Sequence, residues 1–346
     1  MSTDKKSVML ALSGGVDSSV CISILKEMGY EIKAVVMKMS PAHNGTVCAA
    51  QKVADDFGIP LTVLDLQDEF KKCVIDPFIS AYQNAKTPNP CIVCNPLVKF
   101  KFLKKAADDE GCDFFATGHY AKVNFENGRY FISVADEMAR DQSYMLYRLP
   151  QDILSRLILP LGTRFKKDVR EKAQCLSLSS ANAPDSQENC FIPDNDYASY
   201  IIEHGGISKE GYFISPEGEK ITRHKGIIHY TVGQRKGLGI ALGQPVFVNK
   251  IDAESGDVYL TYSGGQFRSE ILVEDCVFML KETLTSPIEA DVKIRSAAKM
   301  QKAIITPTDA RGVVSVKFEI PASAPAPMQS AVFYIDGAVL GGGFIV

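Results

Sequence analysis

Hydrophobic and polar residues follow two different patterns along this chain. In the first half, apolar runs of strand length alternate with stretches in which apolar residues recur about every 3.6 positions. These runs predict strands at 8–12, 32–37, 61–64 and 114–117, and helices at 20–28, 46–57, 70–82 and 100–109. Because strands that alternate with helices are typical of parallel sheets with right-handed crossovers, we expect an α/β domain here.

In the second half the pattern changes to Gly clusters and short runs with period-2 alternation. Strands are predicted at 258–262, 271–277, 288–294, 302–306, 313–318, 330–335 and 338–344. Short strands at regular spacing are typical of a small antiparallel barrel or sandwich. The proline-containing stretch 320–328 is predicted to be a stiff loop. We therefore expect three domains, at 1–197, 198–255 and 256–346.

The turn between the first predicted strand and helix reads Ser13-Gly14-Gly15-Val16-Asp17-Ser18-Ser19. Glycines let the backbone approach an anion, and a helix N-terminus offers free N–H groups. The serines add hydroxyl donors, and Asp17 is suited to orient a metal or the loop itself. The turn lacks the Lys of GxxxxGK[ST] and the spacing of GxGxxG. It predicts a phosphate cradle of another kind; the alternative is a Ser/Gly-rich turn that binds nothing.

Two cysteines, Cys91 and Cys94, lie in the Pro-rich stretch 87–96. Its prolines argue against a regular helix or central strand, so we predict a shaped loop. A thiol in a loop is a stronger candidate for chemistry than one in a core element. Cys190 is a third loop thiol. Most other cysteines are predicted to be small buried hydrophobes, namely Cys21, Cys73, Cys112, Cys175 and Cys276, whereas Cys48 is ambiguous.

The composition of the chain limits the kinds of protein that it can be. The chain has 346 residues, 46% of them hydrophobic, as expected of a soluble globular protein with more than one domain. No signal peptide or membrane-spanning run is evident, so we expect a cytoplasmic protein without a membrane partner.

Nine cysteines, an odd number, favour free thiols, a metal site or catalysis over a disulfide scaffold. Net charge is −3, but basic residues cluster at 99–105, 164–172 and 223–236. Each cluster taken alone is better interpreted as a solvated face.

Several motifs together resemble one enzyme family, the bacterial tRNA-specific 2-thiouridylases of the MnmA type, which are PP-loop ATP-pyrophosphatases. The motifs keep the family's order and cover most of the chain. They are Ser13–Ser19, Thr87–Asn95 running into Lys99-Phe100, Ala116–Tyr120, Arg140–Tyr144, Asn189–Ile192, Thr231–Gly239 and Gln329–Tyr334.

The resemblance implies a PP-loop domain, a small central domain and a C-terminal β-barrel. It implies that Cys94 is the nucleophile and that Cys190 carries or resolves a persulfide, with Asp17 acting in the loop. The residues implied to hold ATP are Ala11, Leu12, Ser13, Gly14, Gly15, Val16, Asp17, Ser18, Met37 and Gly118. Those implied to face the target uridine or the rest of the tRNA are Asn89, Pro90, Cys91, His119, Arg140, Asp141, Gln142, Arg295, Ser296 and Gln329.

The reaction implied is replacement of O2 of a uridine, most simply wobble U34 of tRNA, by sulfur. ATP with Mg²⁺ would adenylate that oxygen, and a thiolate or persulfide would then attack. Expected partners are tRNA and a sulfur donor protein, either a cysteine desulfurase or a sulfur relay. The target base must be flipped out, and anticodon-loop bases are the cheapest to extract.

The chain departs from the family pattern in its active segment. The family usually has Asp where this chain has Cys91, which creates Cys91-x-x-Cys94. Cys91, Cys94 and Cys190 together would suit a [4Fe–4S] cluster with one open iron. Alternatively Cys91 merely replaces the Asp, or forms a redox pair with Cys94. The family's Arg-Tyr pair in the barrel is here Arg295-Ser296, and the segment 41–47 is shorter than usual.

Three other functions stay open at this level. A PP-loop synthetase or amidotransferase acting on a small molecule would share the phosphate turn but needs neither the cysteines nor the barrel. A non-catalytic RNA-binding or sulfur-carrier protein would not need the intact turn, Cys94 and Cys190. An enzyme that thiolates a uridine of another RNA would need the phosphate turn, the cysteines and the barrel.

Overall fold

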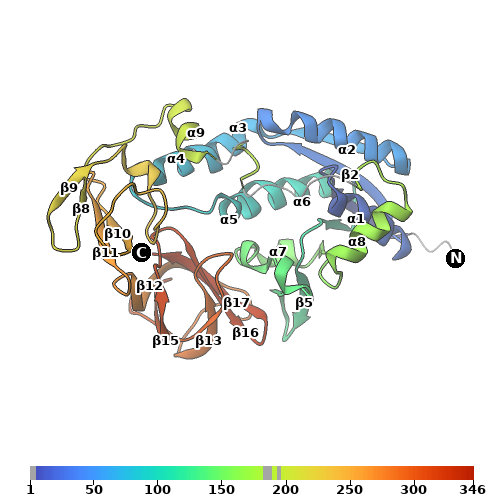
Figure 1. Ribbon diagram of the computed structural model, residues 1–346. Coiled ribbons are helices and arrows are strands. Elements are labelled where there is room, and N and C mark those ends of the chain that lie inside the picture. Colours follow the sequence, from blue (N-terminus) through green and yellow to red (C-terminus); the bar gives the residue numbers. More distant parts are fainter. Residues whose placement is uncertain (1–4, 182–188, 193–195) are drawn as a thin grey trace.

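The computed structural model describes residues 5–181, 189–192 and 196–346, and Figure 1 shows their arrangement. A parallel sheet forms the N-terminal part, in the order β3-β2-β1-β4-β7. Its strands are β1 (Ser7–Ala11), β2 (Glu31–Lys38), β3 (Leu61–Asp65), β4 (Phe114–Ala116) and β7 (Leu157–Ile158). The predicted α/β domain is thereby confirmed.

Helices cover both faces of this sheet. Val8 and Leu10 of β1 share a core with α1 (Val16–Glu27), α2 (Asn44–Phe57) and α8 (Lys166–Cys175). Met9 points to the other face, where it shares a core with α6 (Phe100–Asp109). This division follows from the pleat, because successive strand residues point to opposite sides. Both faces of the sheet are thus covered by helices. Residues that bind or react with a ligand are therefore expected at the ends of the strands.

The predicted loop at 87–96 is wrong, because part of it is helical. α5 (Pro90–Cys94) continues into a π-helix, η3 (Asn95–Lys99), and then into α6. Asn89 caps α5 by accepting a hydrogen bond from the Cys91 backbone N–H at 3.1 Å. Pro90 is tolerated because the first helical position needs no N–H. Cys91 therefore lies at a helix N-terminus.

A second π-helix interrupts the helix predicted at 70–82. That region consists of α3 (Gln67–Phe70), η2 (Lys71–Ile75) and α4 (Asp76–Gln83). The other short elements of the N-terminal part are η1 (Pro41–His43), η4 (Met138–Arg140), η5 (Ser143–Met145) and α7 (Gln151–Leu154). The two π-helices are joined through α5, which contacts both, so the cysteine segment packs within this irregular helical layer.

The central part is a four-stranded sheet in the order β10-β11-β8-β9, and this part of the chain also forms α9 (Tyr197–Glu203) and η6 (Ile227–His229). Its strands are β8 (Tyr212–Ile214), β9 (Lys220–Arg223), β10 (Val246–Ile251) and β11 (Val258–Tyr262). The sequence assigned 258–262 to the barrel, beyond a boundary at 255. The structure corrects this, because β11 pairs with β10 and β8.

The C-terminal part is the expected barrel, closed where β12 pairs with β17. Its strands are β12 (Phe267–Phe278), β13 (Ile288–Lys293), β14 (Gln301–Pro307), β15 (Val314–Ser323), β16 (Ser330–Ile335) and β17 (Ala338–Ile345). A hairpin of β5 (Lys122–Glu126) and β6 (Arg129–Ser133) extends this sheet from the N-terminal part. β15 continues through Pro321, which was predicted to lie in a loop; it falls at a bulge, between partners Lys317 and Ala322, where no ladder N–H is needed.

Candidate active site

The turn after β1 leaves the N-terminus of α1 open. Gly15 is the N-cap and makes no side-chain capping bond. The Ser18 and Ser19 hydroxyls instead donate to the Gly15 carbonyl, at 3.1 and 2.8 Å, and so hold the turn from within. The first-turn N–H groups of a helix lack intrahelical partners, and together with the helix dipole they favour an anion. The turn has the geometry of a phosphate cradle.

Gly14 is required by its packing against α2. Its φ is +74°, and a Cβ added there would lie 2.5 Å from Ala49 Cβ and 2.7 Å from Ala50 N of α2. No side chain larger than hydrogen fits against this helix backbone. Gly15 differs, since its φ is −76° and an added Cβ would meet only the Ser13 hydroxyl, at 3.4 Å.

The topology brings the predicted ATP residues to one edge of the sheet. β1 lies between β2 and β4, so the carboxyl ends of these three strands adjoin. Gly118, just after β4, packs so closely on α1 that an added Cβ would lie 3.2 Å from Ser18 N. Met37 lies near the end of β2 and is buried. The remaining members form the end of β1, the turn and the start of α1: Ala11, Leu12, Ser13, Gly14, Gly15, Val16, Asp17 and Ser18.

Asp17 is held by two residues that sequence reasoning missed. Lys166 Nζ lies 2.8 and 2.6 Å from its two carboxylate oxygens, and the Tyr120 hydroxyl donates to Oδ1 at 2.8 Å. Lys166 belongs to the basic cluster 164–172, which alone resembled a solvated face, yet it is buried. Its burial is a tertiary property without a local sequence signal.

The three candidate thiols line one small cavity of about 30 Å³. Cys91 and Cys94 reach it from α5, and Cys190 from the short described segment 189–192. Met39, next after β2, also lines it, and the Cys94 thiol lies 4.0 Å from the Met39 sulfur. The cavity therefore adjoins the strand end next to the phosphate turn, so the fold brings both predicted chemistries to one edge of the sheet.

The Cys94 thiol is protonated at neutral pH in this geometry. Burial raises the pKa of Cys94 to about 11, against the opposing charge of Lys99. Burial also raises the pKa of Cys91. Lys99 lines the same cavity; the sequence placed it in a family motif and in a basic cluster but assigned it no role. Its ammonium is placed to favour a sulfur anion.

Accessibility separates the thiols. Cys94 is buried, Cys91 is half-buried and Cys190 is exposed. Elsewhere, Cys21 and Cys112 are buried and Cys73 and Cys276 half-buried, whereas Cys48 and Cys175 are exposed. The prediction of a buried Cys175 is therefore wrong, because the side of α8 that carries it faces solvent.

Asn95, which follows Cys94, offers an unused acceptor beside the thiols. Its amide nitrogen donates to the Met145 carbonyl at 2.8 Å, which fixes the orientation of the amide. Its oxygen is buried and has no hydrogen-bond partner among the described residues. Because an unpaired buried acceptor is costly, this oxygen is suited to receive a donor from a bound molecule.

Several predicted RNA-binding residues use their side chains within the protein. Besides its cap, Asn89 directs its amide at Met145 Sδ, 3.5 Å away. Gln329 donates to the Thr87 carbonyl at 2.8 Å and so joins the barrel to the cysteine segment. Gln142 accepts from Tyr120 N at 2.9 Å, and Asp141 accepts from the backbone of Ala135 and Ser143.

The other RNA candidates are more dispersed. Pro90 lines the thiol cavity, and Arg140 is exposed on η4. His119 bonds to Thr117, and burial holds its pKa well below the usual range, so its ring is neutral at pH 7. Arg295 donates to the Val232 and Ala324 carbonyls and thereby joins central part and barrel, with Ser296 half-buried beside it.

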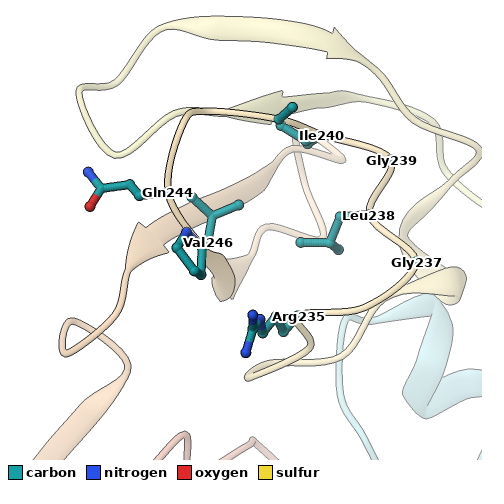
Figure 2. Close-up of a pocket in the computed structure, with 9 residues that line it drawn as sticks. Arg235, Gly237, Leu238, Gly239, Ile240, Gln244 and Val246 are labelled. Atoms are coloured by element: carbon teal, nitrogen blue, oxygen red, sulfur yellow. The ribbon is translucent and has the colours of Figure 1, made fainter.

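A larger cavity, about 410 Å³, lies in the central part. Figure 2 shows Leu238 pointing into the ring of chain that surrounds it, with Arg235 at one side. Leu238 and Val246 are buried, whereas Arg235 and Lys236 are exposed. The basic run of the second half therefore borders this cavity.

Three segments of the chain match known families. Residues 6–194 match the family described as tRNA methyl transferase HUP domain. Residues 199–261 match tRNA methyl transferase PRC-barrel domain, and residues 268–345 match Aminomethyltransferase beta-barrel domain. The second match includes most of β11, in agreement with the strand pairing.

Named relatives match nearly end to end. The tRNA-specific 2-thiouridylase MnmA of Clostridium acetobutylicum is 43% identical over 353 residues, covering 98% of this chain and 99% of the relative. The protein of the same name from Acetivibrio thermocellus is 42% identical over 357 residues, covering 99% of each. A solved 4-thiouridine synthetase–RNA complex with bound ATP has a TM-score of 0.36 and 20% identity, covering 57% of this chain and 50% of that chain.

Within the described ranges, no helix is both long and apolar enough to cross a bilayer.

Proposed function

Since the chain belongs to the MnmA-type family of tRNA-specific 2-thiouridylases, it is a tRNA-uridine sulfurtransferase, and we propose that it uses ATP to thiolate the wobble uridine, U34. One observation carries this proposal: the phosphate turn and the thiol cavity meet at the same edge of the parallel sheet. A tRNA modification enzyme of this kind works where tRNA is used, so we place it in the cytoplasm.

In the first step O2 of uridine attacks the α-phosphorus of ATP, and pyrophosphate leaves. The open N–H groups of α1 are suited to hold the departing anion. Asp17 gives both carboxylate oxygens to Lys166, so these oxygens do not fit a Mg²⁺ ligand set in this geometry. We therefore derive no step through the metal, which would arrive with the ATP phosphates.

Sulfur delivery follows from the accessibility of the two catalytic thiols. Cys190 is exposed and is the thiol that a donor protein reaches, so it carries the persulfide. Its terminal sulfur attacks C2, and AMP leaves with the original oxygen. The buried Cys94 thiol then attacks the Cys190 sulfur, and its proton passes to N3 of the departing 2-thiouridine. A Cys94–Cys190 disulfide is left for an external thiol to reduce. The donor would be a cysteine desulfurase or a sulfur relay protein.

An iron–sulfur cluster on Cys91, Cys94 and Cys190 does not fit the geometry. No group of three metal-ligating side chains is close enough together anywhere in residues 5–181, 189–192 and 196–346. We therefore route no step through a cluster, and Cys91 is assigned to the wall of the cavity, where the family has Asp.

Pyrophosphate release should depend on tRNA. We expect release from ATP to rise at least about tenfold when unmodified tRNA is added, because the acceptor oxygen belongs to the RNA. Nucleoside mass spectrometry of the product should show 2-thiouridine at position 34. Release at the same rate without RNA would favour a small-molecule synthetase, and thiolation of a different uridine would overturn the U34 assignment.

Binding of tRNA should depend on salt through the central basic run. Arg235→Ala with Lys236→Ala should weaken binding and lower the slope of log affinity against log salt by roughly one unit per lost phosphate contact. The measurement is fluorescence anisotropy of labelled tRNA across a salt series. Lys52→Ala, at an exposed position of α2, is the matched control and should leave the slope unchanged. A wild-type slope in the double variant would mean that the run is only a solvated face.

A further inference from the structure

The phosphate turn has an unfavourable charge for its ligand. Asp17 is the only charged residue between Ser13 and Ser19, and it occupies the second position of α1. In GxxxxGK[ST] loops a lysine of the loop itself faces the phosphates, but here no Lys follows the glycines. A carboxylate at the mouth of a triphosphate site repels the ligand and opposes the helix dipole's attraction for anions.

A distant lysine brings the missing charge. Lys166 Nζ lies 2.8 Å from Asp17 Oδ1 and 2.6 Å from Oδ2, although 149 residues separate them in sequence. The Lys166 side chain is 8% exposed and that of Asp17 32%, so the carboxylate lies on the open side of the pair. The first residue of α8 is itself fixed, because Lys166 N donates to Glu137 Oε2 at 2.5 Å.

Tyr120 completes the arrangement. Its hydroxyl donates to Asp17 Oδ1 at 2.8 Å, and its ring centroid lies 6.0 Å from Lys166 Nζ. Tyr120 follows Gly118, which packs on the start of α1. The orientation of Asp17 is therefore set by side chains from two other strand-end segments of the sheet.

Joining α1 to α8 is an insufficient explanation for this buried pair. Lys172 and Glu27 already join the same two helices at their other ends, with Nζ 2.6 Å from Oε1, on an exposed surface. Burying an ion pair gains little stability, because desolvation offsets the attraction. A buried pair at the phosphate turn is better explained by the charge that it removes from the turn.

We propose that Lys166 is the cation of this phosphate turn, a positioning residue that neutralises and orients Asp17 so that the open N-terminus of α1 accepts the phosphates of ATP. The inference rests on the proposed use of ATP. It assigns Lys166 a task that GxxxxGK[ST] loops give to a residue of the loop itself.

The test is a double-mutant cycle on Lys166 and Asp17, in which isothermal titration calorimetry measures the affinity for ATP. Lys166→Met should weaken ATP binding at least about tenfold, because it leaves the Asp17 carboxylate unpaired. Adding Asp17→Asn to Lys166→Met should recover most of that affinity, since the turn is again neutral. Lys166→Arg keeps the charge and should stay closer to wild type than Lys166→Met. Lys172→Met, which breaks only the outer α1–α8 pair, is the matched control and should bind ATP like wild type.

Each result decides the inference. Wild-type ATP affinity in folded Lys166→Met overturns it, as does a double variant that binds as weakly as Lys166→Met. Should Lys166→Met fail to fold by circular dichroism, the double variant decides, because it also removes the carboxylate of Asp17 and must bind ATP. Failure of the wild type itself to bind ATP would instead refute the proposed use of ATP, and this inference with it.

Discussion

Cys94→Ala and Cys190→Ala are each expected to lower tRNA thiolation by at least about 10³-fold, because each removes a sulfur that forms or breaks a covalent bond. Both thiols line one cavity although they lie on separate segments of the chain. The measurement is the 2-thiouridine content of tRNA by mass spectrometry after a timed reaction. Pyrophosphate release should survive in both variants, because adenylation precedes sulfur transfer.

Cys91→Ala distinguishes sulfur transfer by a cysteine persulfide from sulfur transfer through an iron–sulfur cluster. If Cys91 only lines the cavity, this variant should retain substantial thiolation, and anaerobically purified wild type should be colourless and free of iron. Brown wild-type protein that loses its iron and sulfide in Cys91→Ala would overturn that expectation in favour of a cluster. Cys175→Ala, an exposed cysteine on α8, is the matched control and should be fully active.

Gly14→Val is expected to destabilise the α/β part by about 2–5 kcal/mol, because a β-branched residue is strained at φ +74° and its Cβ overlaps the backbone of α2. The overlap with Ala49 therefore predicts a loss of stability in addition to any loss of ATP affinity. Thermal unfolding followed by circular dichroism measures the loss.

Gly15→Ala is the matched control for that substitution. Its backbone conformation suits any residue, and its new methyl group would meet only the Ser13 hydroxyl, at 3.4 Å. We expect its unfolding temperature to stay near that of the wild type, with any defect confined to ATP affinity. Equal melting of wild type and Gly14→Val would contradict the packing argument.

One error of the sequence analysis was avoidable. The prolines at 88–96 were taken to exclude a helix, but Asn89 followed by Pro90 is itself a helix-start signal, an N-cap before a proline at the first position. This signal is local and was present in the sequence. It matters because it places Cys91 on the first turn of α5 rather than in a loop.

The sequence by itself determined the parallel-sheet domain, the C-terminal domain of short antiparallel strands and the phosphate turn. Apolar residues that recur with a period of 2 or 3.6 indicate which side of a strand or helix is buried. The glycines between a strand and a helix indicate the backbone geometry of the turn. Both are properties of neighbours in sequence. The positions of β1, α1 and nearly all barrel strands therefore needed no knowledge of the fold.

Only the tertiary structure decided which distant residues meet. Alternation does not specify a strand's partner, so β11 was assigned to the wrong sheet. Nothing near Asp17 in sequence indicates Lys166, and nothing near Cys94 indicates how Cys190 reaches its cavity. Such contacts depend on how whole elements pack, because burial and charge pairing are set by the combined surfaces of several elements rather than by any one segment.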